Sequence, residues 1–89
     1  MPTRAPATVT VHLVFLARYA ELVGCETADL AVPAPATVET VLTAIRTGLS
    51  RGGELPARPV CALNHRQVPL DAAVSDGDEI ALLPPVAGG

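Results

Sequence analysis

The hydrophobic pattern changes its period along this 89-residue chain, and that change limits the folds available to it. From Val9 to Leu16 the sequence alternates as a half-buried β-strand does and is rich in β-branched residues. The next long apolar segment has helical spacing instead, with its apolar residues at Val38, Val41, Leu42, Ile45 and Leu49. Thr37 precedes this segment and is a suitable N-cap. One long helix among short strands predicts an α+β domain, in which a small mixed sheet packs on that helix.

Shorter segments complete the expected order of strand, strand, helix, strand, short strand and strand. Residues 17–24 predict one or two helical turns, closed by Gly24 in a left-handed conformation. The remaining strands are expected at residues 27–32, 60–63, 67–70 and 79–83, with a polar Gly/Pro-rich loop at 50–59 and a tight turn at 75–78. We expect residues 1–8 to form a flexible N-terminal arm, residues 9–83 the folded domain and residues 84–89 a C-terminal tail.

Composition and charge exclude several classes of partner. Hydrophobic residues make up 49% of the chain but aromatic residues only 2%, so the core must be aliphatic. The net charge is −3 and the six basic residues are scattered arginines, which leaves no stripe for nucleic-acid phosphates. No apolar run approaches the roughly 20 residues of a membrane span. The N-terminal residues lack the pattern of a signal peptide, so we expect a cytoplasmic protein that binds neither nucleic acid nor membrane.

The cysteines and histidines do not predict a metal or redox site. Cys25 and Cys61 lie far apart and form no C-x-x-C pair, and His12 and His65 do not complete a zinc spacing. The acidic residues at 76–79 fit a solvated turn better than a metal cluster. We expect no bound metal, a buried Cys61 that packs as a small hydrophobe, and an exposed thiol at Cys25.

Two consecutive prolines, Pro84 and Pro85, end the last predicted strand, because proline has no N–H for a sheet ladder. The tail can reach at most ~20 Å and ends in Gly88-Gly89. Glycine has no Cβ, so this backbone can enter a narrow channel of another protein. The terminal carboxylate is ionised at neutral pH and is a poor electrophile, so it must be activated before a nucleophile can attack it. The chain has no phosphate-binding loop, so the activating enzyme, which uses ATP, must be a partner.

The alternating strands place apolar side chains on both faces of the predicted sheet. If Phe15 and Leu82 point toward the helix, their neighbours in sequence point away from it. We therefore expect an exposed apolar patch beside the tail, and such patches commonly mark protein interfaces. The predicted partner-binding residues are Val14, Leu16, Ala81, Leu83, Pro84, Pro85, Val86 and Ala87. The alternative is that the N-terminal arm or a further element covers this patch.

Four segments resemble the small, sulfur-carrier subunit of molybdopterin synthase, a ubiquitin-like family of MoaD/ThiS type. They are FLARYAELVG at residues 15–24, TVE at 37–39, ALN at 62–64 and DGDEIALLPPVAGG at 76–89. The similarity covers nearly the whole chain from Val9 onward, and the last fourteen residues are its most specific part. Departures from the family pattern include Ala20, where an arginine is usual, Leu16 and Leu83, where aromatic residues are common, and Gln67, which is often apolar.

The resemblance implies a β-grasp fold of about five strands on one main helix. It further implies that a MoeB-like enzyme adenylates Gly89, that the glycine then carries a thiocarboxylate, and that Gly88-Gly89 enters a MoaE-like large subunit. The resemblance also implies that the two kinds of subunit form a heterotetramer, in which the large subunit holds the catalytic groups. This chain would donate sulfur to cyclic pyranopterin monophosphate and would bind no cofactor permanently. Alternatives are a sulfur carrier for thiamine or cysteine synthesis, a ubiquitin-like modifier of lysines, and a plain interaction module.

Overall fold

The computed structural model describes residues 8–49, 51–56 and 58–84. Their elements, in chain order, are β1 (Thr8–Phe15), α1 (Arg18–Val23), β2 (Thr27–Pro33), β3 (Ala36–Thr37), α2 (Val38–Gly48), the 3-10 turn η1 (Gly52–Glu54), β4 (Val60–Leu63), β5 (Arg66–Val68), β6 (Ala73–Val74) and β7 (Glu79–Leu83). No helix among these described residues is long and apolar enough to cross a membrane.

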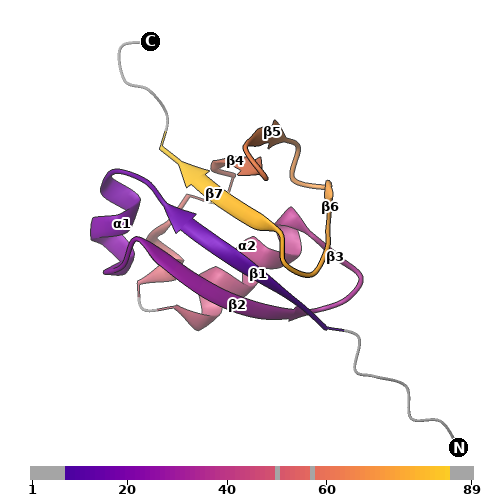
Figure 1. The fold of residues 1–89 in the computed structure, drawn as a ribbon. Helices are drawn as coiled ribbons and strands as arrows, with labels where there is room; N and C mark the ends of the chain where they lie inside the picture. The colour runs from indigo at the N-terminus through magenta and orange to yellow at the C-terminus, as the bar shows by residue number, and fades with distance from the viewer. Residues whose placement is uncertain (1–7, 50, 57, 85–89) are drawn as a thin grey trace, which may run out of the picture.

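Five strands form one mixed sheet in the order β2-β1-β7-β4-β5. β1 runs parallel to β7, whereas the β1–β2, β4–β7 and β4–β5 pairs are antiparallel. The main helix α2 lies across one face of this sheet, and no described element covers the other face, which we call the open face (Figure 1). This arrangement confirms the predicted α+β architecture, and it places the last strand, β7, at the centre of the sheet.

The alternation within the strands separates the core from the open face, as predicted. Val9, Val11, Leu13 and Phe15 of β1 are buried, and Ile80 and Leu82 of β7 are fully buried beside them. These side chains meet the apolar stripe of α2, whose buried residues are Val38, Val41, Leu42 and Ile45. The core therefore forms between α2 and one face of the sheet, and it is almost entirely aliphatic.

The start of α2 is fixed by a reciprocal cap. The Thr37 hydroxyl accepts the backbone N–H of Thr40 at 3.2 Å, and the Thr40 hydroxyl accepts the N–H of Thr37 at 3.1 Å. Two of the amides that a helix start leaves unpaired are satisfied in this way. The predicted cap at Thr37 is confirmed, as is Gly24, which closes α1 at φ 87°.

The described part of the segment expected to be a polar loop contains a short 3-10 turn. Residues 52–54 form η1, Gly52 and Leu55 are buried, and the Arg46 guanidinium donates to the Leu55 carbonyl. A second difference is a two-stranded sheet in which β3 pairs with β6. The strand expected at residues 67–70 is β5, which is shorter and spans Arg66–Val68. It ends before Pro69, because proline has no N–H to donate to a sheet ladder.

Candidate docking face and C-terminal exit

β7 leads to the C-terminal tail from the middle of the sheet. Its last residues are held on both sides: the Leu16 N–H donates to the Leu82 carbonyl at 3.3 Å, and Leu83 pairs with Val60 of β4. Pro84 follows directly and is half-buried. Because proline has no N–H, strand pairing ends here. The strand pairing therefore fixes the position from which the tail begins, beside the last residue of β1 and the first residue of β4.

The predicted apolar patch lies on the open face of the sheet at this exit. Val14 of β1 pairs with Ala81 of β7, so their side chains are neighbours on one face. Leu16 is 38% exposed, while Val14, Ala81 and Leu83 are half-buried. The structure therefore brings these four residues together beside Pro84, and no described element covers them. Whether the N-terminal arm does so lies outside the described residues, which begin at Thr8.

Two further members of the patch were missed from the sequence. Val60 is 38% exposed and lies opposite Leu83, and Ala62 lies opposite Ala81 on the same strand pair. Directly opposed residues of antiparallel strands share a face. The sequence did contain a signal for them. Cys61 was expected to be buried, and the residues on either side of it in a strand, Val60 and Ala62, must then point to the opposite face. We call Val14, Leu16, Val60, Ala62, Ala81 and Leu83 the apolar patch.

A hollow of about 440 Å³ adjoins the apolar patch between β1, α1 and the start of β2. Val14, Leu16 and Ala20 contribute apolar walls, and its charged side chains are Glu21 and Glu26. The departure at Ala20 therefore has a structural consequence. A small side chain at this position lines the hollow, where the family pattern has an arginine.

The described residues do not bring together a catalytic constellation. Cys61 is 1% exposed, its thiol lies 3.7 Å from the Pro59 carbonyl, and burial raises its pKa to about 11. Such a thiol stays protonated at neutral pH and is a poor nucleophile. Cys25 is half-buried, not exposed as expected. No group of three or more candidate metal ligands occurs in the part of the chain that the structure describes.

The acidic turn before β7 has a structural role in the described fold. Asp76 accepts the Thr10 N–H at 2.7 Å, and Asp78 accepts the Ser75 N–H at 2.7 Å. Gly77 takes φ 88°, as predicted for this tight turn. These contacts set the approach of β7 to β1 and so help to position the exit of the tail.

The predicted site residues of the tail itself lie outside the described residues. These are Pro85, Val86, Ala87, Gly88 and Gly89. Their proposed roles therefore stay predictions. What the structure supplies is their point of origin at Pro84 and the surface around it.

A mixed sheet of five strands, wrapped on one main helix with the last strand at its centre, defines a ubiquitin-like β-grasp protein. Its fold matches a putative molybdopterin converting factor subunit 1 from Pyrococcus furiosus, with a TM-score of 0.76 at 26% identity over 88% of this chain and 99% of that one. SAMP1 from Haloferax volcanii matches with a TM-score of 0.74 at 31% identity, over 90% of this chain and 99% of that one.

The chain belongs to the ThiS family, whose model matches residues 13–89. A molybdopterin synthase sulfur carrier subunit of Haemophilus influenzae is 35% identical over 89% of this chain and 99% of its own length. The protein of the same description from Escherichia coli is 32% identical over 89% of this chain and 99% of its own length. One chain of a complex of subunits 1 and 2 of the molybdopterin-converting factor from Helicobacter pylori shares the fold, with a TM-score of 0.64 at 24% identity over 91% of this chain and 100% of that one.

Proposed function

We propose that this chain is the sulfur-carrier subunit of a molybdopterin synthase and that it carries sulfur on the Gly89 carboxylate. The observation that carries the proposal is the position of β7. It is the central strand, it pairs with β1 as far as Leu82 and with β4 as far as Leu83, and it leads to the tail beside an exposed apolar patch. The relatives named as carriers of this kind support it over their whole length.

The chemistry begins with activation of a poor electrophile. The Gly89 carboxylate attacks the α-phosphate of ATP on a partner enzyme, which releases pyrophosphate and leaves an acyl adenylate. Sulfide (HS⁻) then attacks the acyl carbon, the bond to AMP breaks, and AMP leaves with a thiocarboxylate remaining on Gly89. Because no described residue offers an activated nucleophile, we assign both steps to a MoeB-like adenylating enzyme, with ATP as its substrate.

The second partner is the large subunit of the synthase, which we propose assembles with this chain into a heterotetramer. The apolar patch supplies a docking surface for it, and Gly88-Gly89 supplies a terminus thin enough to enter a channel. There the sulfur passes to cyclic pyranopterin monophosphate, with the catalytic groups on the large subunit. In this scheme the chain donates sulfur and does not itself catalyse, and it works in the cytoplasm.

Reconstitution tests the proposal directly. The purified chain, incubated with a MoeB-like enzyme, ATP, a sulfide source, the large subunit and the pterin precursor, should yield molybdopterin. A variant without Gly89 should still fold but yield none. Product formation by that truncated variant would contradict the role given to Gly89.

A second candidate function is protein modification, and a specific observation favours it. SAMP1, a 31% identical structural neighbour, belongs with proteins described as small archaeal modifiers. The same activated Gly89 could be transferred to a lysine of a target protein. This chain has no lysine itself, so its own side chains offer no ε-amine as acceptor. Isopeptide-linked adducts that end in Gly89, found in cells by mass spectrometry, would establish this second use.

A further inference from the structure

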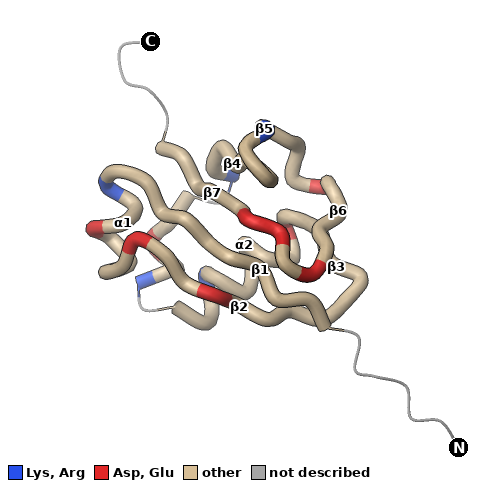
Figure 2. The backbone as a smooth tube through the Cα atoms, viewed as in Figure 1, with Lys and Arg blue, Asp and Glu red and all other residues tan. Residues whose placement is uncertain are grey.

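The charged side chains on the open face of the sheet are all of one sign. Within the described β1, β2 and β7, the only formally charged residues are Asp29 and Glu79. Figure 2 shows acidic segments on β2, on β7 and in the turn before β7, with no basic segment on β1, β2 or β7. On β1, β2 and β7 the formal charge is therefore acidic alone, and the nearest described arginines are Arg18 of α1 and Arg66 of the edge strand β5.

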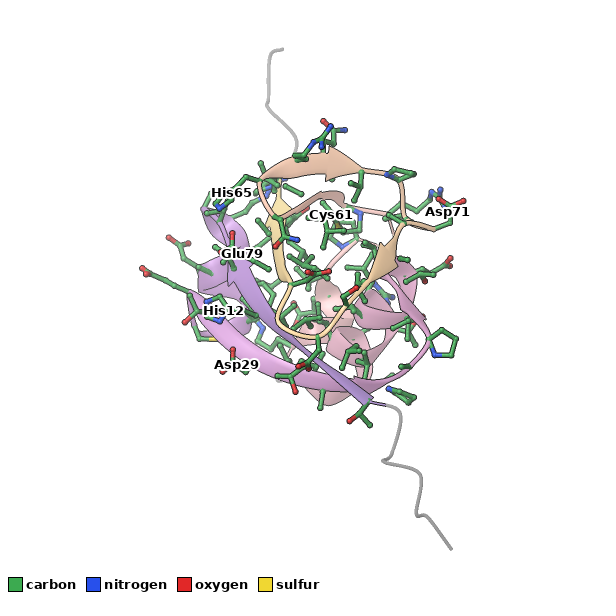
Figure 3. All side chains as sticks on the ribbon, turned by 45° about the vertical axis from the view of Figure 1, so that its right-hand side comes forward. His12, Asp29, Cys61, His65, Asp71 and Glu79 are labelled. Atoms are coloured by element: carbon green, nitrogen blue, oxygen red, sulfur yellow. The ribbon has the colours of Figure 1, made fainter. Side chains whose placement is uncertain are left out.

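Two of the carboxylates lie in a row across the sheet with the two histidines. Asp29 contacts His12 Nδ1 at 2.8 Å, His12 pairs with Glu79 across β1 and β7, and Glu79 lies 3.8 Å from His65 Nε2. Figure 3 shows the four labelled residues along one side of the molecule, with Asp71 on the opposite side. The Asp29 side chain is 69% exposed, so it can still accept hydrogen bonds from a partner.

The hollow places two more carboxylates at another edge of the apolar patch. Glu21 and Glu26 both line it, and its remaining walls are largely apolar. Arginine and lysine side chains combine a long apolar stem with a cationic head, so they suit a hollow of this composition. Within the described residues, Arg51–Glu54 is the one arginine–carboxylate ion pair, so none of the arginines among those residues pairs with a carboxylate of the open face.

We infer that the open face docks a cationic partner surface, whose apolar centre covers the apolar patch. Arginine or lysine side chains of that partner pair with Glu21 and Glu26 in the hollow and with Asp29 and Glu79 in the row. This inference rests on the proposed function, because it takes the large subunit of the synthase as the partner. Opposite charges at the edge of an interface act chiefly on the association rate and on its salt dependence.

The test compares two double variants that remove the same charges from different places. Glu26→Gln/Asp29→Asn removes one Glu and one Asp from the open face. Glu39→Gln/Asp71→Asn removes one of each from α2 and from the turn before β6, and both of these residues are exposed. The two variants have equal net charge, and circular dichroism checks that both fold. Association with the purified large subunit from the same organism is then measured at low and at high salt.

We expect the open-face variant to associate roughly three- to tenfold more slowly at low salt and to show a weaker salt dependence than the unmodified chain. The control variant should keep the rate and the salt dependence of the unmodified chain. Equal slowing of both variants, or no slowing of either, would overturn the inference while leaving the proposed function intact. Failure of the unmodified chain to bind the large subunit at any salt would overturn both.

Discussion

Cys61 shows how one buried residue can be assigned from its neighbours in the sequence. It was expected to be a small hydrophobe because it lies in an apolar stretch, and it is 1% exposed beside β5 and β7. Burial disfavours the thiolate and raises the pKa of its thiol to about 11, from a usual value near 9. The half-buried state of Cys25 was not predictable, because it depends on how α1 packs.

The raised pKa of Cys61 predicts a loss of stability in alkaline solution. The folded state keeps the thiol proton to about pH 11, whereas the unfolded state releases it near pH 9. The stabilising contribution is therefore complete below pH 9 and falls as the pH rises toward 11, by roughly 2–3 kcal/mol. Urea denaturation at pH 8 and pH 10.5 should show this loss. Cys61→Ala should show a smaller loss than the unmodified chain, and equal losses would contradict the assignment.

Gly52 is fixed by a close approach of two backbone segments. A Cβ at this position would lie 2.1 Å from the Ile45 carbonyl oxygen, so η1 would have to move away from α2. We expect Gly52→Ala to lower the free energy of unfolding by roughly 1–3 kcal/mol, as overpacking usually does. Gly53→Ala is the matched control, since its Cβ would meet nothing closer than 3.6 Å. Chemical denaturation of both variants measures the difference, and equal stability would contradict the packing argument.

Among the helices and strands, the spacing of apolar residues and the N-cap residue predicted those elements that neighbouring residues in the sequence determine. The stripe and the cap at Thr37 predicted α2, and alternation predicted β1, β4 and β7 closely. Residues 50–59 were assigned to a loop, because neither a 3-10 turn nor the burial of Gly52 has a periodic signal. The β3–β6 pair was missed for a related reason. Each strand has two residues, and only long-range pairing defines them.

The cap of α2 gives a prediction of its own. Thr37→Ala removes the oxygen that accepts the Thr40 N–H, and it leaves that amide without its partner. We expect a loss of about 1 kcal/mol of stability. Thr37→Ser keeps the oxygen and should lose much less. Thermal denaturation of the two variants distinguishes the cap from the packing of the threonine methyl group, and equal losses would assign the effect to the methyl group.

At the scale of the whole molecule, the fold separates stability from docking. The helix α2 covers one sheet face (Figure 1), and the core lies between them, whereas the apolar patch lies on the other face beside Pro84. Sequence alternation placed four of its six residues, but Val60 and Ala62 required the β4–β7 register. The tail was identified from its sequence, and its site residues stay predictions.

This separation predicts that the apolar patch can be altered without unfolding the chain. Leu16→Ser exchanges an exposed leucine beside the exit of the tail, so we expect the thermal midpoint to change little. Binding to the large subunit should weaken by tenfold or more, because apolar contacts at the centre of an interface carry much of its energy. Ala73→Ser, an exposed site on β6 in the separate two-stranded sheet, is the control. Equal binding of both variants in calorimetric titration would contradict the patch as an interface.

If Gly89 carries sulfur, intact mass spectrometry detects that sulfur on the chain itself. The purified chain is incubated with a MoeB-like enzyme, ATP and a sulfide source, and the mass is then measured on the whole chain and on its C-terminal peptide. We expect a mass gain equal to the replacement of one oxygen by sulfur, localised to Gly89. An unchanged mass, with an enzyme shown to be active on another carrier, would contradict it.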